Sequence, residues 1–272
     1  MEMPQKIRRP RAVRAGKQPE HRGLAGEAYA SVRERIVRGE LAIGQVISRR
    51  KIAAELGMSF LPVTEALIRL ENEGLLESRP RAGTRVRVPT RQDVEGHYVV
   101  REALEVQAAM LFSERAQREE RSELMKLARR VDALSAQSDG DRFVYAALHE
   151  KLHQQIAEFA RCPALTAAIS RTSAIASTWL CATRASSRAN PPTHHQDLMK
   201  VLASRSPAAA SEAMREHIRF SMQNALRRLE LYFKIQKQYP QEYPRNSKKV
   251  LSLEWIISET DAESVLPSER PA

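Results

Sequence analysis

The segment from residue 48 to residue 75 constrains the fold most, because two helical patterns follow each other with only a tight turn between them. In "SRRKIAAELGM", Ser48 is suited to the N-cap of a helix and Gly57 to the left-handed residue that ends it. In "SFLPVTEALIRLENEGL", Ser59 stands at the capping position of the next helix. The apolar residues of that helix recur at i, i+3, i+4 and i+7, and they are Val63, Ala66, Leu67 and Leu70. This stripe predicts a helix that packs inward on one face and leaves the other face free.

A further helical pattern precedes this segment, and a strand pattern follows it. "LAGEAYASVRERIVRGEL" has apolar residues at helical spacing and is ended by Gly39. "LLESRPRAGTRVRV" predicts two short strands joined by a turn through Pro80 and Gly83. Two helices, a tight turn, a third helix and a hairpin predict a winged helix-turn-helix, which we place at residues 23–89. Such a domain lays its third helix in the major groove of double-stranded DNA.

After Pro89 the pattern is helical as far as residue 234. We predict helices over residues 91–116, 118–136, 140–160, 164–186, 193–204 and 207–234, separated by polar breaks or breaks that carry Gly or Pro. Six helices of this length predict one helical bundle over residues 91–234. Residues 1–22 predict a disordered basic arm, and residues 235–272 a loosely ordered C-terminal extension. The predicted fold class is therefore mainly α.

The charge of the chain points to an anionic partner. The formal net charge is +11 and the isoelectric point is near 10. The basic arm contributes to this charge, but the rest of the chain stays basic without it. Nucleic acid is the first partner to consider and an anionic membrane surface the second. The sequence contains no run of 18 apolar residues, so we expect no membrane-spanning helix. Its two cysteines do not suggest a disulfide framework, and we therefore expect a cytoplasmic protein.

The stretch "HEKLH", at residues 149–153, fits the H-E-x-x-H motif of zinc proteases. His149 and His153 share one helix face, so both could bind one ion. The extended form of the motif needs glycine and histidine where this chain has Ile156 and Phe159. No glutamate follows Glu158 before residue 212 to act as the third ligand of a thermolysin-like site. A metal-dependent hydrolase therefore stays only as an alternative.

Residues 28–88 resemble the winged-helix domain of the GntR family of bacterial transcription regulators, through "ISRRKIAAELGMS" and "PVTEALIRLENEGLLESRPRAGTRV". Residues 91–234 resemble the all-helical FCD domain, the effector-binding half of the FadR-like branch. The matching stretches are "REALEVQAAML", "LHEKLHQQIAEFARCPAL" and "HHQDLMKVLASRSPAAASEAMREHI". The resemblance implies a homodimeric regulator, more often a repressor than an activator.

The resemblance also implies a metal site, because many FCD domains hold a divalent ion with one aspartate and three histidines. His153, His195 and His217 match the three histidines, and His149 stands where the family has aspartate. Four imidazoles would favour zinc, nickel, cobalt or copper over manganese, and we expect zinc or nickel. In an alternative arrangement His149 does not bind the ion, and water or effector fills its place. Taken singly, a helical histidine is more often a surface residue or a hydrogen-bonded core residue.

The resemblance gives Arg101 the role of binding a small carboxylate effector, since a guanidinium suits bidentate carboxylate binding. The alternative is that Arg101 pairs with Glu105, its i+4 neighbour. A regulator that senses metal alone, with no organic effector, also remains open.

The segment that should read DNA departs from the family pattern. The family has S-R-x-P-V-R-x-A where this chain has S-F-L-P-V-T-E-A, so Phe60 and Thr64 replace two arginines. Phe60, Leu61 and Thr64 could instead contact thymine methyl groups. In the alternative, Phe60 and Leu61 pack locally and DNA binding is weak. The complete set of predicted DNA-contacting residues is Arg49, Arg50, Ser59, Phe60, Leu61, Thr64, Arg79, Arg81, Gly83 and Thr84.

Overall fold

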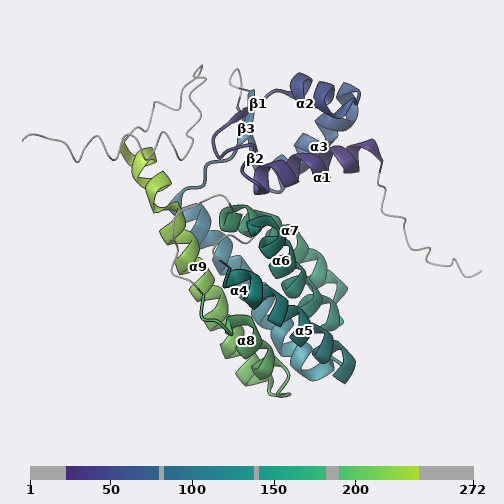
Figure 1. The fold of residues 1–272 in the computed structure, drawn as a ribbon, viewed down its shortest axis with the longest axis vertical. Coiled ribbons are helices and arrows are strands. Elements are labelled where there is room, and N and C mark those ends of the chain that lie inside the picture. Colours follow the sequence, from purple (N-terminus) through teal and green to yellow (C-terminus); the bar gives the residue numbers. More distant parts are fainter. Residues whose placement is uncertain (1–22, 80–82, 138–140, 182–189, 239–272) are drawn as a thin grey trace, which may run out of the picture.

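The computed structural model describes residues 23–79, 83–137, 141–181 and 190–238. These residues form a small domain with a three-stranded sheet and a larger domain of helices, joined through the N-terminus of a long helix (Figure 1). The predicted fold class is confirmed. The basic arm predicted for residues 1–22 lies outside the described residues. Of the C-terminal extension predicted for residues 235–272, the first four residues continue the last helix of the bundle, and the rest lies outside the described residues.

The first domain is a winged helix-turn-helix. Its helices are α1 (Leu24–Val37), α2 (Arg49–Leu56) and α3 (Phe60–Asn72), and its strands are β1 (Val46–Ile47), β2 (Leu76–Arg79) and β3 (Gly83–Val86). The sheet is antiparallel with the order β1-β3-β2, and β2 and β3 form the predicted hairpin. The prediction of two strands was incomplete. The third, β1, has only two residues and exists because Val46 and Ile47 pair with β3 nearly forty residues away.

The predicted caps of this domain are partly confirmed. The Ser48 hydroxyl accepts a hydrogen bond from the backbone N–H of Lys51 at 3.3 Å. Gly57 ends α2 with φ at 63°, a left-handed conformation that suits glycine. Ser59 is the N-cap residue of α3, but its side chain makes no capping hydrogen bond. The predicted stripe of α3 is buried, with Val63, Ala66, Leu67 and Leu70 each at most 1% exposed.

The second domain contains helices α4 (Arg91–Arg115), α5 (Arg118–Ser135), α6 (Arg142–Phe159), α7 (Pro163–Cys181), α8 (His194–Leu202) and α9 (Pro207–Gln238). All six were predicted, and the last five residues of the prediction for α7, residues 182–186, lie outside the described residues. The long helices α4 and α9 run along each other (Figure 1). Helix α6 packs against α4, α5 and α7, and α5 packs against α6 and α8. Their shared core includes Phe112, Leu124, Leu152, Ile156 and Met199, each at most 1% exposed.

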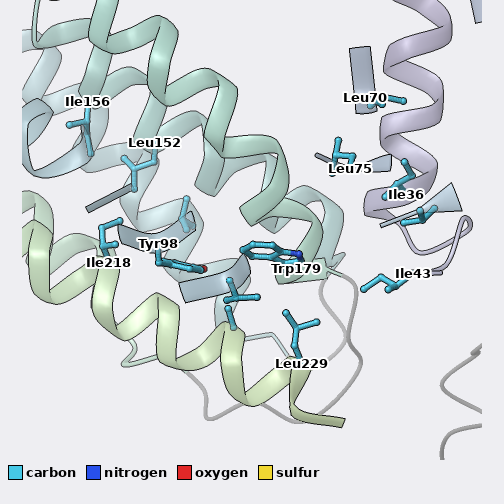
Figure 2. Packing of buried hydrophobic residues seen from close by; sticks show 14 of the residues in the cluster. Ile36, Ile43, Leu70, Leu75, Tyr98, Leu152, Ile156, Trp179, Ile218 and Leu229 are labelled. Carbon is cyan, nitrogen blue, oxygen red and sulfur yellow. The ribbon is translucent and has the colours of Figure 1, made fainter. Parts of the chain in front are cut away.

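The two domains touch through α1 and the helices α6 and α7. The guanidinium of Arg33 on α1 donates to Glu150 Oε2 on α6 at 2.7 Å. The Arg38 guanidinium lies 4.1 Å from the ring centre of Phe143. Apolar side chains continue across the junction, where Ile43 of the first domain lies opposite Trp179 of the bundle (Figure 2). Among the described residues, no helix is both long and apolar enough to cross a membrane.

Candidate functional site

Five of the seven histidines of the chain meet at one place inside the helical domain. His149 and His153 come from α6, where a spacing of four residues puts them on one face. His194 and His195 come from the start of α8, and His217 comes from α9. Three helices that are distant in sequence therefore supply one cluster of imidazoles, the histidine cluster.

The histidine cluster has the geometry of a set of metal ligands. His153 Nε2 lies 3.3 Å from His149 Nε2 and 3.3 Å from His217 Nε2. One ligand atom from each of these three residues lies within 4.8 Å of the other two. His195 is adjacent, with its ring centre 5.1 Å from that of His149 and 5.3 Å from that of His217. Ring nitrogens that converge in this way suit a transition-metal ion that accepts their lone pairs.

Two buried carboxylates contact the Nδ1 atoms of two histidines of this cluster. Asp132 on α5 lies 2.6 Å from His195 Nδ1 and also accepts the backbone N–H groups of His195 and Gln196. His195 Nε2 is buried and has no hydrogen-bond partner among the described residues. Glu105 Oε2 lies 2.5 Å from His153 Nδ1. A carboxylate on the outer nitrogen fixes the ring and leaves the inner nitrogen free to bind a metal.

Burial sets the charge of the cluster. It lowers the pKa of His149 and of His217 well below the usual range, and the neighbouring His153 lowers both further. Burial also lowers the pKa of His194, to about 4. Burial alone would raise the pKa of Glu105, but Arg101 and His153 outweigh it and hold that pKa at about 2. Burial thus favours the neutral forms of His149, His194 and His217, next to the ionised carboxylate of Glu105.

A cavity of about 40 Å³, the histidine cavity, opens beside the cluster. Such a volume holds an ion with a few waters. Most of the residues that line it are polar, and besides the histidines they include Tyr98, Arg101, Tyr145, Ser173, Asn190, Asn224 and Arg228. Arg101 therefore faces the site, as predicted for an effector ligand. It also makes the alternative contact, since its Nε donates to Glu105 Oε1 at 2.7 Å and both side chains are at most 5% exposed.

Glu150, the central acid of the H-E-x-x-H match, is held in an ion pair. Its Oε2 accepts from Arg33 and its Oε1 accepts from Gln154 at 3.1 Å. Glu150 lies at the edge of the histidine cavity, while its carboxylate links α6 to the first domain. The residue that a hydrolase would use as general base thus connects two domains.

Some residues of the site were not found from the sequence. Asp132 was not predicted, His194 was set aside in favour of its neighbour His195, and Glu105 was considered only as a partner of Arg101. Asp132 stands one turn after Ala128, on the buried face of α5 that also carries Leu124 and Val131. A carboxylate in an apolar stripe needs a buried partner, and this was the available signal.

On the first domain, the exposed face of α3 carries large apolar side chains beside the charged Glu65 and Arg69. Phe60 is 53% exposed, Leu61 67% and Ile68 49%, so Phe60 and Leu61 do not pack locally. The hydroxyl of Thr64 donates to the backbone carbonyl of Phe60 at 2.8 Å, which occupies the polar end of that side chain. This face offers methyl and aromatic groups to a partner.

The other predicted DNA-contacting residues have mixed positions. Arg50, Arg79 and Gly83 are exposed, and Arg81 lies outside the described residues. Arg49 is half-buried and lies 3.4 Å from the hydroxyl of Thr84. The prediction for Thr84 needs correction, because its side chain is only 3% exposed. It is held inside the sheet by Arg49 and by Ser78 at 2.9 Å.

Comparisons with known proteins place both domains. A family model described as "Bacterial regulatory proteins, gntR family" matches residues 24–86, and one described as "FCD domain" matches residues 97–220. A "Probable D-xylose utilization operon transcriptional repressor" from Paenarthrobacter nicotinovorans is 34% identical over 122 residues, which are 44% of this chain and 52% of that protein. The HTH-type regulator YdhC from Bacillus subtilis is 28% identical over 131 residues, which are 48% of this chain and 58% of that protein. The chain thus spans about half the length of these curated relatives.

Two solved structures share the fold. McbR/YncC from E. coli superposes with a TM-score of 0.62 at 18% identity, over 75% of this chain and 98% of that one. A candidate GntR transcriptional regulator from Rhodococcus sp. RHA1 also reaches 0.62, at 20% identity, over 74% and 97% of the two chains. At these identities the likeness concerns the fold alone.

Proposed function

Because the chain belongs to the GntR family of bacterial regulatory proteins and carries an FCD domain behind its winged helix, we propose that it is a DNA-binding transcription repressor. In this proposal it works in the cytoplasm as a homodimer on a two-half-site operator. In this proposal, a small organic acid that binds at a metal-containing pocket changes the affinity of the protein for its operator. The convergence of three histidine nitrogens beside a polar cavity is the observation that carries the proposal.

The residues present fit a divalent transition metal. His149, His153 and His217 would hold the ion, with His195 as the fourth imidazole that its buried, unpartnered Nε2 makes available. Neutral imidazoles without an aspartate favour zinc or nickel over manganese. When bound, the ion would supply a positive charge that no carboxylate ligand neutralises, and this charge would attract an anionic group into the cavity.

The effector in this proposal is a small carboxylate. Arg101 lies in the cavity wall, and its buried pair with Glu105 and the contact of Glu105 with His153 tie it to the metal ligands. A carboxylate at the ion would therefore also affect the charges around Arg101. The metal alone is the second candidate signal, since the cavity of about 40 Å³ leaves limited room beside an ion.

The operator in this proposal is read mainly by apolar contact. The exposed side chains of Phe60 and Leu61 suit thymine methyl groups in the major groove, while Arg50 and Arg79 are placed to contact phosphates. Such a site would be richer in thymine at the contacted positions than sites read by paired arginines. Sequence specificity then depends on a small number of methyl contacts.

A chain of polar contacts offers a route between the two sites. Glu150 follows the metal-binding candidate His149 directly and pairs with Arg33 on α1. One turn earlier on α1, the Tyr29 hydroxyl donates to Glu73 at 2.6 Å, and Glu73 is the C-cap residue of α3. A shift of α6 at the metal site would thus displace α1 and, through Tyr29 and Glu73, the C-terminal end of α3. The coupling requires that metal or effector bind the two domain arrangements with different affinity.

Calorimetric titration of metal-stripped protein with zinc tests the proposal first. We expect one ion per chain with the wild-type protein and loss of binding with His153→Ala. Simple carboxylic acids are then titrated into zinc-loaded protein, where binding that needs both zinc and Arg101, tested as Arg101→Lys, supports an organic effector. Zinc binding with no response to any carboxylate would favour the purely metal-sensing regulator.

A further inference from the structure

A second pocket, the junction pocket, lies between the two domains and shares no residue with the histidine cavity. Its volume is about 170 Å³. The winged helix contributes Ile43 and Leu75 to its wall, and the bundle contributes Ile175 and Trp179. Figure 2 shows Ile43 and Trp179 lying opposite each other at this place. Both domains therefore line one pocket, whose wall combines these apolar side chains with the polar Arg87, Asp93 and His97.

A single histidine gives the junction pocket a hydrogen-bond acceptor. His97 on α4 lines it and packs edge-on against Trp179, with ring centres 5.0 Å apart. His97 Nε2 is buried and has no hydrogen-bond partner among the described residues. In the tautomer that has its proton on Nδ1, Nε2 keeps its lone pair and can accept a hydrogen bond.

The charges of the junction pocket cancel, so it offers no site for a charged ligand. Burial, followed by the charge of Arg101, lowers the pKa of His97 to about 4, and the ring is neutral at pH 7. Arg87 and Asp93, which also line the pocket, pair with each other at 2.7 Å. Asp93 further accepts the N–H and the hydroxyl of Thr90 at 2.9 and 2.8 Å. A neutral ligand with one hydrogen-bond donor fits this wall.

We propose that the junction pocket binds a small neutral phenol, a single aromatic ring that carries a hydroxyl group. An apolar cavity of about 150 Å³ is known to take up benzene, so the volume suits one ring. The ring packs between Ile175, Trp179 and Ile43, and its hydroxyl donates to His97 Nε2. Since the wall comes from both domains, a bound phenol stabilises the observed arrangement of the winged helix on the bundle. The site is thus a second place at which a small molecule affects DNA binding.

Fluorine NMR on the full-length, metal-stripped protein tests this site directly. The probe is 4-fluorophenol, and the matched control is fluorobenzene, which has the same ring and no donor. We expect saturable binding of both, with the phenol about tenfold tighter, the usual effect of one hydrogen bond to a buried acceptor. Absence of saturation into the millimolar range, or equal affinity for the two probes, overturns the proposal.

Three variants locate the binding. His97→Phe keeps a ring and removes the acceptor, so 4-fluorophenol should fall to the affinity of fluorobenzene. Ile175→Trp fills the pocket, so both probes should lose affinity. His153→Ala lies in the histidine cavity and should change neither. Far-UV circular dichroism and zinc uptake check that the first two variants fold. Binding that survives His97→Phe and Ile175→Trp but disappears in His153→Ala would place the ligand elsewhere and refute the site.

Discussion

The ion pair between Arg33 and Glu150 gives the sharpest test of how the two domains are joined. Its atoms lie 2.7 Å apart, and the side chains are 23% and 15% exposed. Exposed ion pairs contribute about 0.2–1 kcal/mol, and hydrogen bonds to charged groups about 1.5–3 kcal/mol. A partly buried pair lies between these ranges. We therefore expect a coupling free energy of about 1.4 kcal/mol, which corresponds to a tenfold change in an equilibrium constant.

A double-mutant cycle measures that coupling. The free energy of unfolding in urea is determined for Arg33→Ala, Glu150→Ala and the double variant. Glu150 also bonds to Gln154, so its single variant loses more than the pair, and only the cycle isolates the interaction of interest. The expected result is that the double variant loses about 1.4 kcal/mol less than the sum of the single losses. The matched control is Glu158→Ala, an exposed glutamate on the same helix, which should show no coupling with Arg33.

Additive losses in this cycle would refute the reasoning. They would mean that the contact contributes nothing to the arrangement of the domains and cannot carry a signal between them. If the coupling is found, the same variants should reduce the effect of zinc on DNA affinity, because the pair connects the helix of His149 to α1. An unchanged zinc effect in Glu150→Ala would leave the contact structural and direct attention to the other junction contacts.

Three further variants test the metal ligands and the DNA-reading face. His153→Ala removes the Nε2 atom that lies nearest to those of His149 and His217. In a chelator competition, this variant should bind zinc more than about 100-fold more weakly than the wild-type protein. Near-normal zinc affinity would rule out His153 as a ligand. Asp132→Asn should weaken zinc binding by about 10- to 100-fold by loosening His195, whereas Asp197→Asn, an exposed change on α8, should have no effect. Phe60→Ala should weaken binding to the operator by about tenfold and leave the salt dependence of binding unchanged. Gel-shift titrations at several salt concentrations measure both quantities. An equal loss of affinity for random DNA would contradict a role of Phe60 in reading the sequence.

Most of the fold could be predicted from local patterns in the sequence. The stripe through Val63 and Leu70 predicted α3, and the six helices of the bundle were recognised from helical spacing and their breaks. What local patterns could not predict was pairing over distance. Strand β1 has two residues, too few to show alternation, and it is defined by its partner on β3.

The site shows the same division. His149 and His153 were predicted to act together because four residues make one helical turn, whereas His195 and His217 came from a family resemblance. Asp132 lies 63 residues from the His195 it holds, and no local spacing connects them. Thr84 was predicted to contact DNA. The register of the sheet turns its side chain inward, next to Ser78.

The most direct measurement is a binding titration of the purified protein on DNA from upstream of its own gene. It is made with metal-stripped and zinc-loaded protein, at two salt concentrations, with random DNA of equal length as control. A regulator that reads thymine methyl groups and senses metal should bind the upstream fragment far more tightly than random DNA, and zinc should change that affinity. Equal, salt-sensitive binding to both DNAs, with no effect of zinc, would show only phosphate contacts and contradict a sequence-specific, metal-responsive repressor.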